Sequence, residues 1–558
     1  ASDNTAVGFD SLKANTTGTT NVAVGVNSLV ANTTGSASVA IGCDAMCKTT
    51  TGGTSVAIGR SALCSNVTSS SNTAIGYQAL RKNTAANNTA VGDNALGLNT
   101  TGCQSSAVGS SALAANTEGC FNTAVGYNAL LSNTTADRNT AVGMGNLSAT
   151  TTGCCNTALG QGTMAANTTG DNNVAIGTLA LSTAQTADNN TAVGYLALCA
   201  NTTGCLNTAV GVCSSCAMTT GQQNISMGGS SLIANTTGSR NSALGMSSLA
   251  ANTTADDNAA VGHGALSTNT DGHSNTAVGR AALQANTTAD ENVAVGFQAL
   301  NSVTTQGAMT AVGTCALKNT TGAQNTGFGY KALTTNSSGQ CNTALGLCAL
   351  TANTSASYNT AVGHSSMLKT TTGFANTAMG LFSMACNTTG DAHVAIGYES
   401  LLNNTTADNN IAIGCKAMRA NTTGHSNTTI GTLALDANTT GTNNTAVGTC
   451  ALSSGTTGIS NTAIGNGAMY EGVTTGDYNT MVGNNSGRKM TSGTQNTSSG
   501  VNSMELNTTG ANNAAFGMNS LAANTTASNN VAIGHSALTT NTTGGGNTAM
   551  GVCALNAN

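Results

Sequence analysis

Residues 122–138 read N-T-A-V-G-Y-N-A-L-L-S-N-T-T-A-D-R, and variants of this seventeen-residue sequence follow one another along the whole chain. The glycine at its fifth position, Gly126, has counterparts from Gly8 to Gly551, 33 glycines in all. Successive glycines lie 17 residues apart, except for two steps of 16 and one of 18. A short fixed period over 558 residues predicts a stack of similar coils rather than a globular enzyme.

The repeat unit is N-T-A-V-G-x-x-A-L-x-A-N-T-T-G-x-x, and we refer to its residues as positions 1 to 17. Apolar residues at helical spacing are absent from it. Thr-Ala-Val and Ala-Leu-x-Ala are short segments bounded by turn-forming residues, which predicts two short strands per coil. The sequence therefore predicts an all-β fold: a β-solenoid, or parallel β-roll, of about 33 coils that runs as one domain over residues 1–558.

Two columns of large apolar residues are expected to form the core. Position 4 is Val, Ile, Leu, Met or Phe except at Ser499, and position 9 is Leu or Met except at Ser215 and Gly487. Two such side chains per coil make a thin core, because ordering seventeen residues costs about 1–2 kcal/mol each. We therefore expect the alanines of position 3 to pack on another chain. The alternative is that a small residue merely suits a narrow coil.

Three copies of the first strand carry a resemblance to a known family. The segments N-V-A-V-G at 21–25, S-V-A-I-G at 55–59 and N-V-A-I-G at 173–177 resemble the head repeats of trimeric autotransporter adhesins. The repeats also resemble the N-T-A-V-G-Y-x-A-L repeats of phage tail-fibre-like proteins. The resemblance implies a left-handed parallel β-roll built from three chains. Here the repeat is longer than in the family, because its turn carries an Asn-Thr-Thr insertion, and the family's stalk and membrane anchor are missing from the sequence.

The two ends of the chain are nearly in phase with each other. Ala1, Ser2 and Asp3 fit positions 15 to 17, and Asn556, Ala557 and Asn558 fit positions 10 to 12. A terminal coil without a cap exposes a β-edge on which the next copy can stack. This phase predicts a head-to-tail filament, since a heterologous contact that does not close continues indefinitely. The alternative is a fragment of a longer chain whose caps have been lost.

The 18 cysteines are placed unevenly on the repeat. Stacked equivalents have Cα atoms about 4.8 Å apart, which lies within the range that disulfides span. Three pairs share a position in adjacent coils and are predicted to form disulfides: Cys47 with Cys64, Cys103 with Cys120, and Cys199 with Cys216. Two weaker candidates are Cys205 with Cys213 and Cys341 with Cys348; for the second pair the alternative is that each cysteine pairs with another neighbour. Disulfides indicate an oxidising, extracellular setting.

Composition excludes several function classes. Charged residues make up 6% of the chain and the net charge is −5, which gives no basis for binding nucleic acid or inserting into a membrane. The histidines and acids form no recurring metal or catalytic pattern, so we expect no cofactor, no metal and no enzyme activity. A calcium column along the turn aspartates is not expected, because single carboxylates supply too few ligands.

Position 12 is usually Asn followed by Thr-Thr, which makes N-x-T sequons. The candidate glycosylation sites are Asn15, Asn32, Asn133, Asn167 and Asn201. The competing interpretation is that Asn-Thr-Thr is the turn that the stack requires. The coils around residues 461–512 depart most from the repeat, and they represent a tolerated defect, a recognition spot or a flexible joint.

Three function classes remain. The sequence favours a structural subunit of an extracellular filament, whose partners are further copies of itself. The second class is an adhesin or receptor-binding fibre shaft of a bacterial surface or virion, which acts as a homotrimer on a host or neighbouring cell surface. The third class is ice binding. An argument against it is that the adjacent threonines at positions 13 and 14 would point to opposite sides of a strand.

Overall fold

The chain is a parallel β-solenoid with one coil for each seventeen-residue repeat, as the sequence predicts. A computed structural model describes residues 1–556, and within that range every regular element is a strand and none is a helix. The chain divides into two compact units, residues 1–275 and 276–558.

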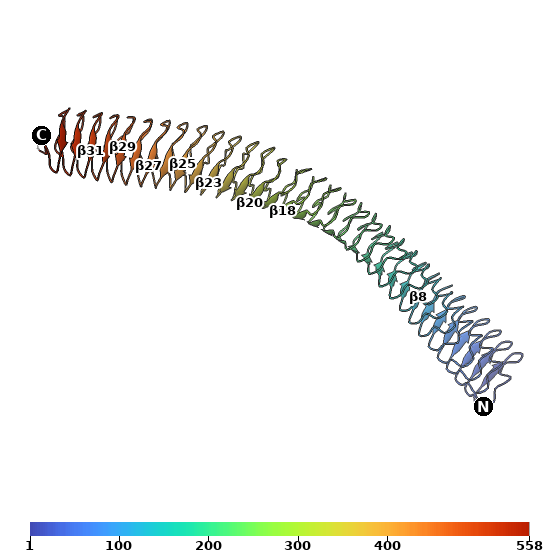
Figure 1. The fold of residues 1–558 in the computed structure, drawn as a ribbon. Coiled ribbons are helices and arrows are strands. Elements are labelled where there is room, and N and C mark those ends of the chain that lie inside the picture. The colour runs from blue at the N-terminus through green and yellow to red at the C-terminus, as the bar shows by residue number, and fades with distance from the viewer. Residues whose placement is uncertain (557–558) are drawn as a thin grey trace. The chain divides into compact units, whose positions relative to one another are not determined.

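Unit 1, residues 1–275, contains sixteen strands of three residues each (Figure 1). They are β1 (Thr5–Val7), β2 (Val22–Val24), β3 (Val39–Ile41), β4 (Val56–Ile58), β5 (Thr73–Ile75), β6 (Thr89–Val91), β7 (Ser106–Val108), β8 (Thr123–Val125), β9 (Thr140–Val142), β10 (Thr157–Leu159), β11 (Val174–Ile176), β12 (Thr191–Val193), β13 (Thr208–Val210), β14 (Ile225–Met227), β15 (Ser242–Leu244) and β16 (Ala259–Val261).

Unit 2, residues 276–558, contains seventeen strands. They are β17 (Thr276–Val278), β18 (Val293–Val295), β19 (Thr310–Val312), β20 (Thr326–Phe328), β21 (Thr343–Leu345), β22 (Thr360–Val362), β23 (Thr377–Met379), β24 (Val394–Ile396), β25 (Ile411–Ile413), β26 (Thr428–Ile430), β27 (Thr445–Val447), β28 (Thr462–Ile464), β29 (Thr480–Val482), β30 (Thr497–Ser499), β31 (Ala514–Phe516), β32 (Val531–Ile533) and β33 (Thr548–Met550).

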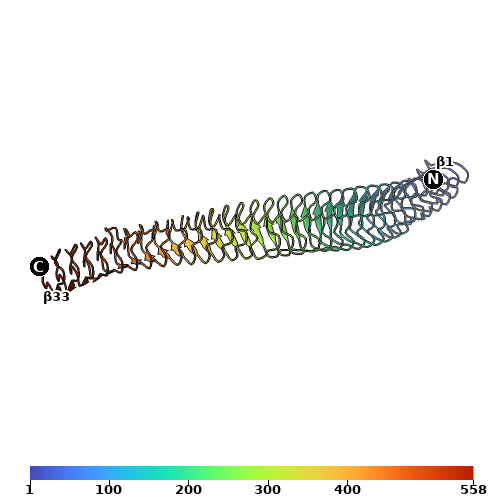
Figure 2. The ribbon, with the colours of Figure 1, turned by 90° about the horizontal axis from the view of Figure 1, so that it is seen from above.

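Within each unit, every strand pairs in parallel with the strand of the next coil. In β8 and β9 the register places Thr123 on Thr140 and Val125 on Val142. Figure 2 shows the consequence from above: equivalent parts of successive coils lie side by side along each unit. A residue type that recurs at one position therefore becomes a continuous column.

The structure has one strand per coil, so the predicted second strand is wrong. The Ala-Leu segment is instead a series of turns in which positions 7 and 9 adopt left-handed backbone angles, as at Asn128 with φ 58° and Leu130 with φ 52°. This conformation costs an L-residue roughly 1–2 kcal/mol. Burying the leucine side chain returns about 1.5–3 kcal/mol. The segment adopts this bend because the bend places the leucine side chain inside the coil, where its burial outweighs the conformational cost.

The core is built from alanine and leucine, and the prediction that position 4 lies inside is wrong. Ala124, Ala129 and Leu130, at positions 3, 8 and 9, are fully buried, whereas Val125 at position 4 is 37% exposed. Side chains alternate along a strand, so positions 2 and 4 must share the face opposite to position 3. The prediction that the alanine column packs on another chain is also wrong, because that column faces the interior of its own coil.

Two columns of asparagine complete the interior. At position 1, the Asn122 Nδ2 donates to the Ala136 carbonyl at 2.7 Å, and its Oδ1 accepts the Asn139 backbone N–H at 2.9 Å. At position 12, the Asn133 Nδ2 donates to the Asn116 Oδ1 of the preceding coil at 2.7 Å. Buried polar groups are costly unless they are hydrogen-bonded. These two ladders satisfy the backbone at the place where each coil closes.

The glycine of position 5 is required by its surroundings. Gly126 has φ +136°, and a Cβ added to it would lie 2.5 Å from the Gly143 carbonyl oxygen of the next coil. The backbones of adjacent coils therefore approach too closely at this corner for any side chain. The coils around residues 461–512 keep the sheet register despite their longer step, since Thr462 of β28 pairs with Thr480 of β29.

Candidate functional surface

The outward side of the sheet in each unit is the most distinctive surface of the molecule. Its side chains come from positions 2 and 4 of the strands, and we call it the sheet face. In unit 1 the position-4 residues Val125 and Leu159 are 37% and 46% exposed, and in unit 2 Phe328 is 50% exposed. The inward alanines of the same strands are fully buried. The sheet face therefore presents one aliphatic row to solvent along each unit.

The sheet face carries no charge. None of the residues at positions 2 and 4 of the 33 strands is charged, and 20 of the 33 residues at position 2 are threonine. Its chemistry is therefore a row of methyl-bearing hydroxyls beside a row of branched aliphatic side chains. The sequence signal for this face was the alternation Thr-Ala-Val, in which the small residue marks the inside.

In a minority of coils an aromatic side chain follows the corner glycine at position 6 and borders the sheet face. Tyr127 in unit 1 is 57% exposed, and Phe297 and Tyr330 in unit 2 are also exposed. The Arg280 guanidinium lies 5.8 Å from the centre of the Phe297 ring. Aromatic rings and arginine are enriched at protein interfaces, so these coils carry residue types that are common at contact surfaces.

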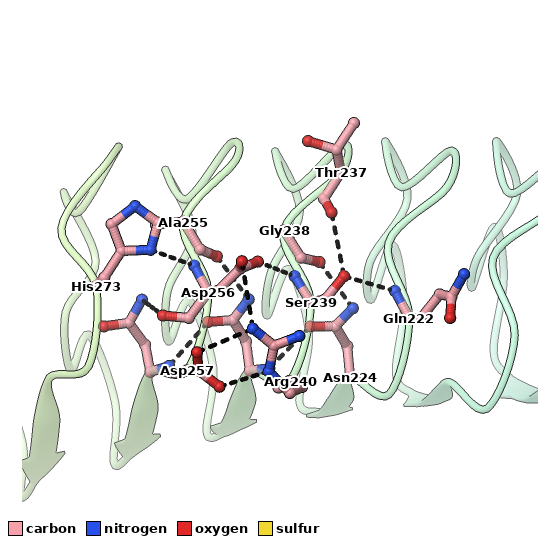
Figure 3. A network of polar contacts seen from close by, with 12 residues as sticks. Gln222, Asn224, Thr237, Gly238, Ser239, Arg240, Ala255, Asp256, Asp257 and His273 are labelled. Atoms are coloured by element: carbon pink, nitrogen blue, oxygen red, sulfur yellow. Dashed lines mark hydrogen bonds and ion pairs between the residues drawn. The ribbon is translucent and has the colours of Figure 1, made fainter.

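The polar residues at position 16 have a structural role, because their side chains accept backbone hydrogen bonds. At position 16, the Gln222 N–H donates to the Ser239 Oγ at 3.1 Å and the Ser239 N–H donates to the Asp256 Oδ1 at 2.6 Å (Figure 3). The Asp256 N–H in turn donates to the His273 Nδ1 at 3.0 Å. Each of these side chains thus accepts a backbone N–H of the preceding coil.

One ion pair flanks this row in Figure 3. The Arg240 guanidinium bonds Asp257 at 2.7 Å, and this hydrogen bond lowers the pKa of the Asp257 carboxyl. Both side chains are exposed, so the pair contributes little to stability. Among the described residues, no three His, Cys, Asp or Glu side chains gather in a way that would hold a metal ion.

The three main cysteine pairs meet as their shared positions predict. The Sγ atoms are 2.7 Å apart in Cys47 and Cys64, 2.9 Å in Cys103 and Cys120, and 3.1 Å in Cys199 and Cys216. All six are free thiols in the structure, since a disulfide bond is about 2.05 Å long. The juxtaposition is established, and the bonds themselves remain a prediction.

The two weaker cysteine pairs are not brought together. Cys205 accepts the Asp188 N–H at 3.3 Å, as a position-16 residue does, while Cys213 lies at position 7 and its N–H donates to the Tyr195 carbonyl. Cys341 donates to the Gln324 Oε1 at 3.3 Å, and Cys348 lies at position 7 of the next coil. Closeness in sequence is not sufficient to bring two cysteine sulfurs into contact, because contact requires that both cysteines occupy the same position in adjacent coils.

Four of the five candidate glycosylation sites lie inside the coil. Asn32, Asn133, Asn167 and Asn201 are buried in the position-12 ladder, and Asn15 in the first coil is half-buried. A glycan on a buried amide would have to displace the ladder and the turn. The geometry supports the turn interpretation of Asn-Thr-Thr.

The residues proposed as assembly ends are exposed where they are described. Ala1, Ser2, Asp3 and Asn556 are solvent-exposed, whereas Ala557 and Asn558 lie outside the described residues. Among described residues the structure has no helix with the length and apolarity of a membrane span.

Comparison with known proteins gives no identification. No protein-family model matches the chain, and no curated protein matches its sequence.

Proposed function

We propose that the chain is a structural subunit of an extracellular fibre, and that its sheet face packs laterally on a second copy. One observation carries the proposal: the sheet face is uncharged and carries a half-exposed, largely aliphatic row at position 4 in both units. Soluble monomers rarely expose contiguous apolar patches larger than a few hundred Å². Packing of a second copy on this face would remove its apolar side chains from water and so favour the assembled state.

The size of the face suits a specific interface. With strands about 4.8 Å apart and about 3.3 Å per residue, the sixteen strands of unit 1 present roughly 75 Å by 10 Å. A stable protein interface buries about 800 Å² per partner. One unit alone therefore reaches the area of a typical specific complex.

The periodicity of the face favours a second copy as its partner. Every coil presents its aliphatic side chain at the sheet spacing of about 4.8 Å. Only a surface with the same spacing can interdigitate with each of these side chains, and another copy of this chain has it. Large residues such as Phe328 in unit 2 interrupt the uniform row and select among the possible registers.

Sedimentation velocity over a range of concentrations tests the proposal. The informative variant places charges on the face of unit 1 by Val108→Asp, Val125→Asp and Val142→Asp. The matched control places three charges on exposed turn residues by Thr101→Asp, Thr135→Asp and Thr152→Asp. We expect the wild type and the control to associate side by side, and the face variant to lose this association and to sediment as a monomer or as a single-width end-to-end chain. A monomeric wild type, or a face variant that associates like the control, would contradict lateral packing.

Two other functions are possible for the same face, and further measurements distinguish them from lateral self-association. A homotrimeric adhesin shaft predicts a mass of three chains and binding to a cell surface. The other function is ice binding, because the position-2 threonines and the position-4 aliphatic residues lie on one regular exposed face. Thermal hysteresis that is lost in the face variant would favour it over self-association. Head-to-tail stacking of copies and an extracellular location remain predictions.

A further inference from the structure

We infer that three cysteine pairs of unit 1 are oxidisable staples: Cys47 with Cys64, Cys103 with Cys120, and Cys199 with Cys216. A small-molecule disulfide, such as glutathione disulfide, is the oxidant class that would close them. Each staple would join two adjacent coils covalently. The inference is independent of lateral packing.

Geometry carries this inference. The two sulfur atoms of each pair are 2.7, 2.9 and 3.1 Å apart in the order given above. The backbones need little movement, because equivalent residues of paired coils lie about 4.8 Å apart and disulfides span Cα separations of 4.4–6.8 Å. All six side chains are only half-buried, so a small oxidant can reach them.

The surroundings of Cys47 and Cys64 make this pair the most reactive. The Cys47 and Cys64 thiols share a hydrogen bond, and this bond together with the positive charge of Lys48 and Arg81 lowers the pKa of Cys64 to about 7. The same contact raises the pKa of Cys47. Burial raises the pKa of Cys199 to about 12. Since the thiolate is the nucleophile, Cys64 is the sulfur that attacks first.

The reaction is a balanced thiol–disulfide exchange. The Cys64 thiolate attacks one sulfur of glutathione disulfide, forms a mixed disulfide and releases one glutathione thiolate, which takes up a proton. Cys47 then loses its proton and attacks the Cys64 sulfur of the mixed disulfide, forming the protein disulfide and releasing the second glutathione. The protein pair loses two electrons and two protons, and the glutathione disulfide gains them.

The staples stiffen one unit and leave the sheet face unchanged. The cysteines occupy positions 10 and 16, whereas the sheet face consists of positions 2 and 4. No two cysteines within residues 276–558 share a position in adjacent coils, so unit 2 has no equivalent pair. Oxidation is therefore expected to change the local stability of unit 1 only.

The test treats the reduced full-length protein with glutathione disulfide at neutral pH and quenches samples over time with N-ethylmaleimide. Non-reducing peptide mapping after digestion between the partners is expected to find the three linked pairs, with Cys47–Cys64 first. Stable glutathione adducts at these cysteines, links to other cysteines, or complete alkylation of all six would overturn the inference.

Matched variants and a second readout keep the result interpretable. Cys47→Ser should trap glutathione on Cys64, whereas the control Cys315→Ser should leave all three links intact. Hydrogen exchange should slow by about tenfold or more in the stapled coils of unit 1 and stay unchanged in unit 2. Equal exchange in oxidised and reduced protein would show that the links do not act as staples. Sedimentation of both forms separates this outcome from a failure of lateral packing.

Discussion

Met481 occupies the space that Gly487 leaves empty in the same coil: a Cβ added to Gly487 would lie 2.8 Å from the Met481 sulfur. Most coils have Ala at position 3 and Leu at position 9, and this coil has a large and a small residue in the reverse order. Met481 is fully buried. The irregular sequence within 461–512 therefore contains a volume exchange across the core of one coil.

The exchange predicts strong coupling between the two residues. Met481→Ala alone opens a cavity and should cost about 2–5 kcal/mol, and Gly487→Leu alone overpacks the coil and should cost about 1–3 kcal/mol. The double variant restores the common pattern and should be close to wild type. Native-state hydrogen exchange of β28 to β30 measures the three local free energies. Additive costs in the double variant would mean that the two side chains do not share one space.

Glycine at position 5 should be far less replaceable than glycine at position 7. Gly126→Ala places a Cβ 2.5 Å from the Gly143 carbonyl oxygen at φ +136°, whereas a Cβ on Gly145 has nothing within 4 Å. Gly145 has φ +68°, similar to the angles that other residues adopt at position 7. We expect a loss of about 3 kcal/mol or more for Gly126→Ala and about 1 kcal/mol or less for Gly145→Ala.

Thermal unfolding followed by circular dichroism compares these two alanine variants. The informative result is a large decrease in the melting temperature for Gly126→Ala with little change for Gly145→Ala. Similar melting curves for both would show that the backbones at the corner can move apart.

His393 replaces asparagine in the position-1 ladder and should make its coil sensitive to acid. It is fully buried, its Nδ1 accepts the Asn410 N–H at 3.1 Å, and its Nε2 lies 2.6 Å from the Ala407 carbonyl oxygen. The ring is therefore neutral with its proton on Nε2. Burial lowers the pKa of His393, and the backbone hydrogen bonds to Ala407 and Asn410, with smaller contributions from the nearby carboxylates, only partly oppose this.

The sign of the pH effect follows from the lowered pKa. Between the unfolded pKa of about 6.5 and the lower folded value, the unfolded chain binds more protons. The contribution of His393 is complete above about pH 6.5 and decreases as the pH falls below that value. Hydrogen exchange around β24 should accelerate from pH 7 to pH 5 beyond the intrinsic rate change. His393→Asn restores the repeat residue and should remove this acceleration, and its persistence in that variant would assign the effect to another group.

The sequence predicted the coil but not which side of the strand is buried. The unbroken glycine column and the period fixed the stacking, and the shared positions of Cys47 and Cys64 placed their sulfurs in contact. Size favoured Val125 over Ala124 for the core, and that choice was wrong. In a coil this narrow, Leu130 reaches across the interior and leaves room for only a methyl group opposite.

The second error has the same origin. Ala-Leu-x-Ala reads as a strand because its residues are apolar, and nothing in their chemistry indicates a left-handed backbone at Leu130. The bend exists because tertiary packing of the leucine outweighs its local conformational cost. The sheet face was missed for this reason, since it becomes visible only once the inside of the coil has been assigned.

The position-12 ladder should discriminate sharply between an amide and a carboxylate. The Asn133 Nδ2 donates both to the Asn116 Oδ1 at 2.7 Å and to the Ala136 carbonyl at 3.2 Å. Asn133→Asp, which deamidation also produces, would bring an unpaired buried charge against two acceptors and should cost about 3–5 kcal/mol. The control Asn189→Asp alters an exposed position-17 residue, where Asp257 already occurs in another coil, and should be neutral. Limited proteolysis is expected to cleave only the first variant, in the turns next to residue 133. Equal resistance of both variants would mean that the ladder tolerates a repulsive contact, and asparagine at position 12 would then be a turn former without a stabilising amide.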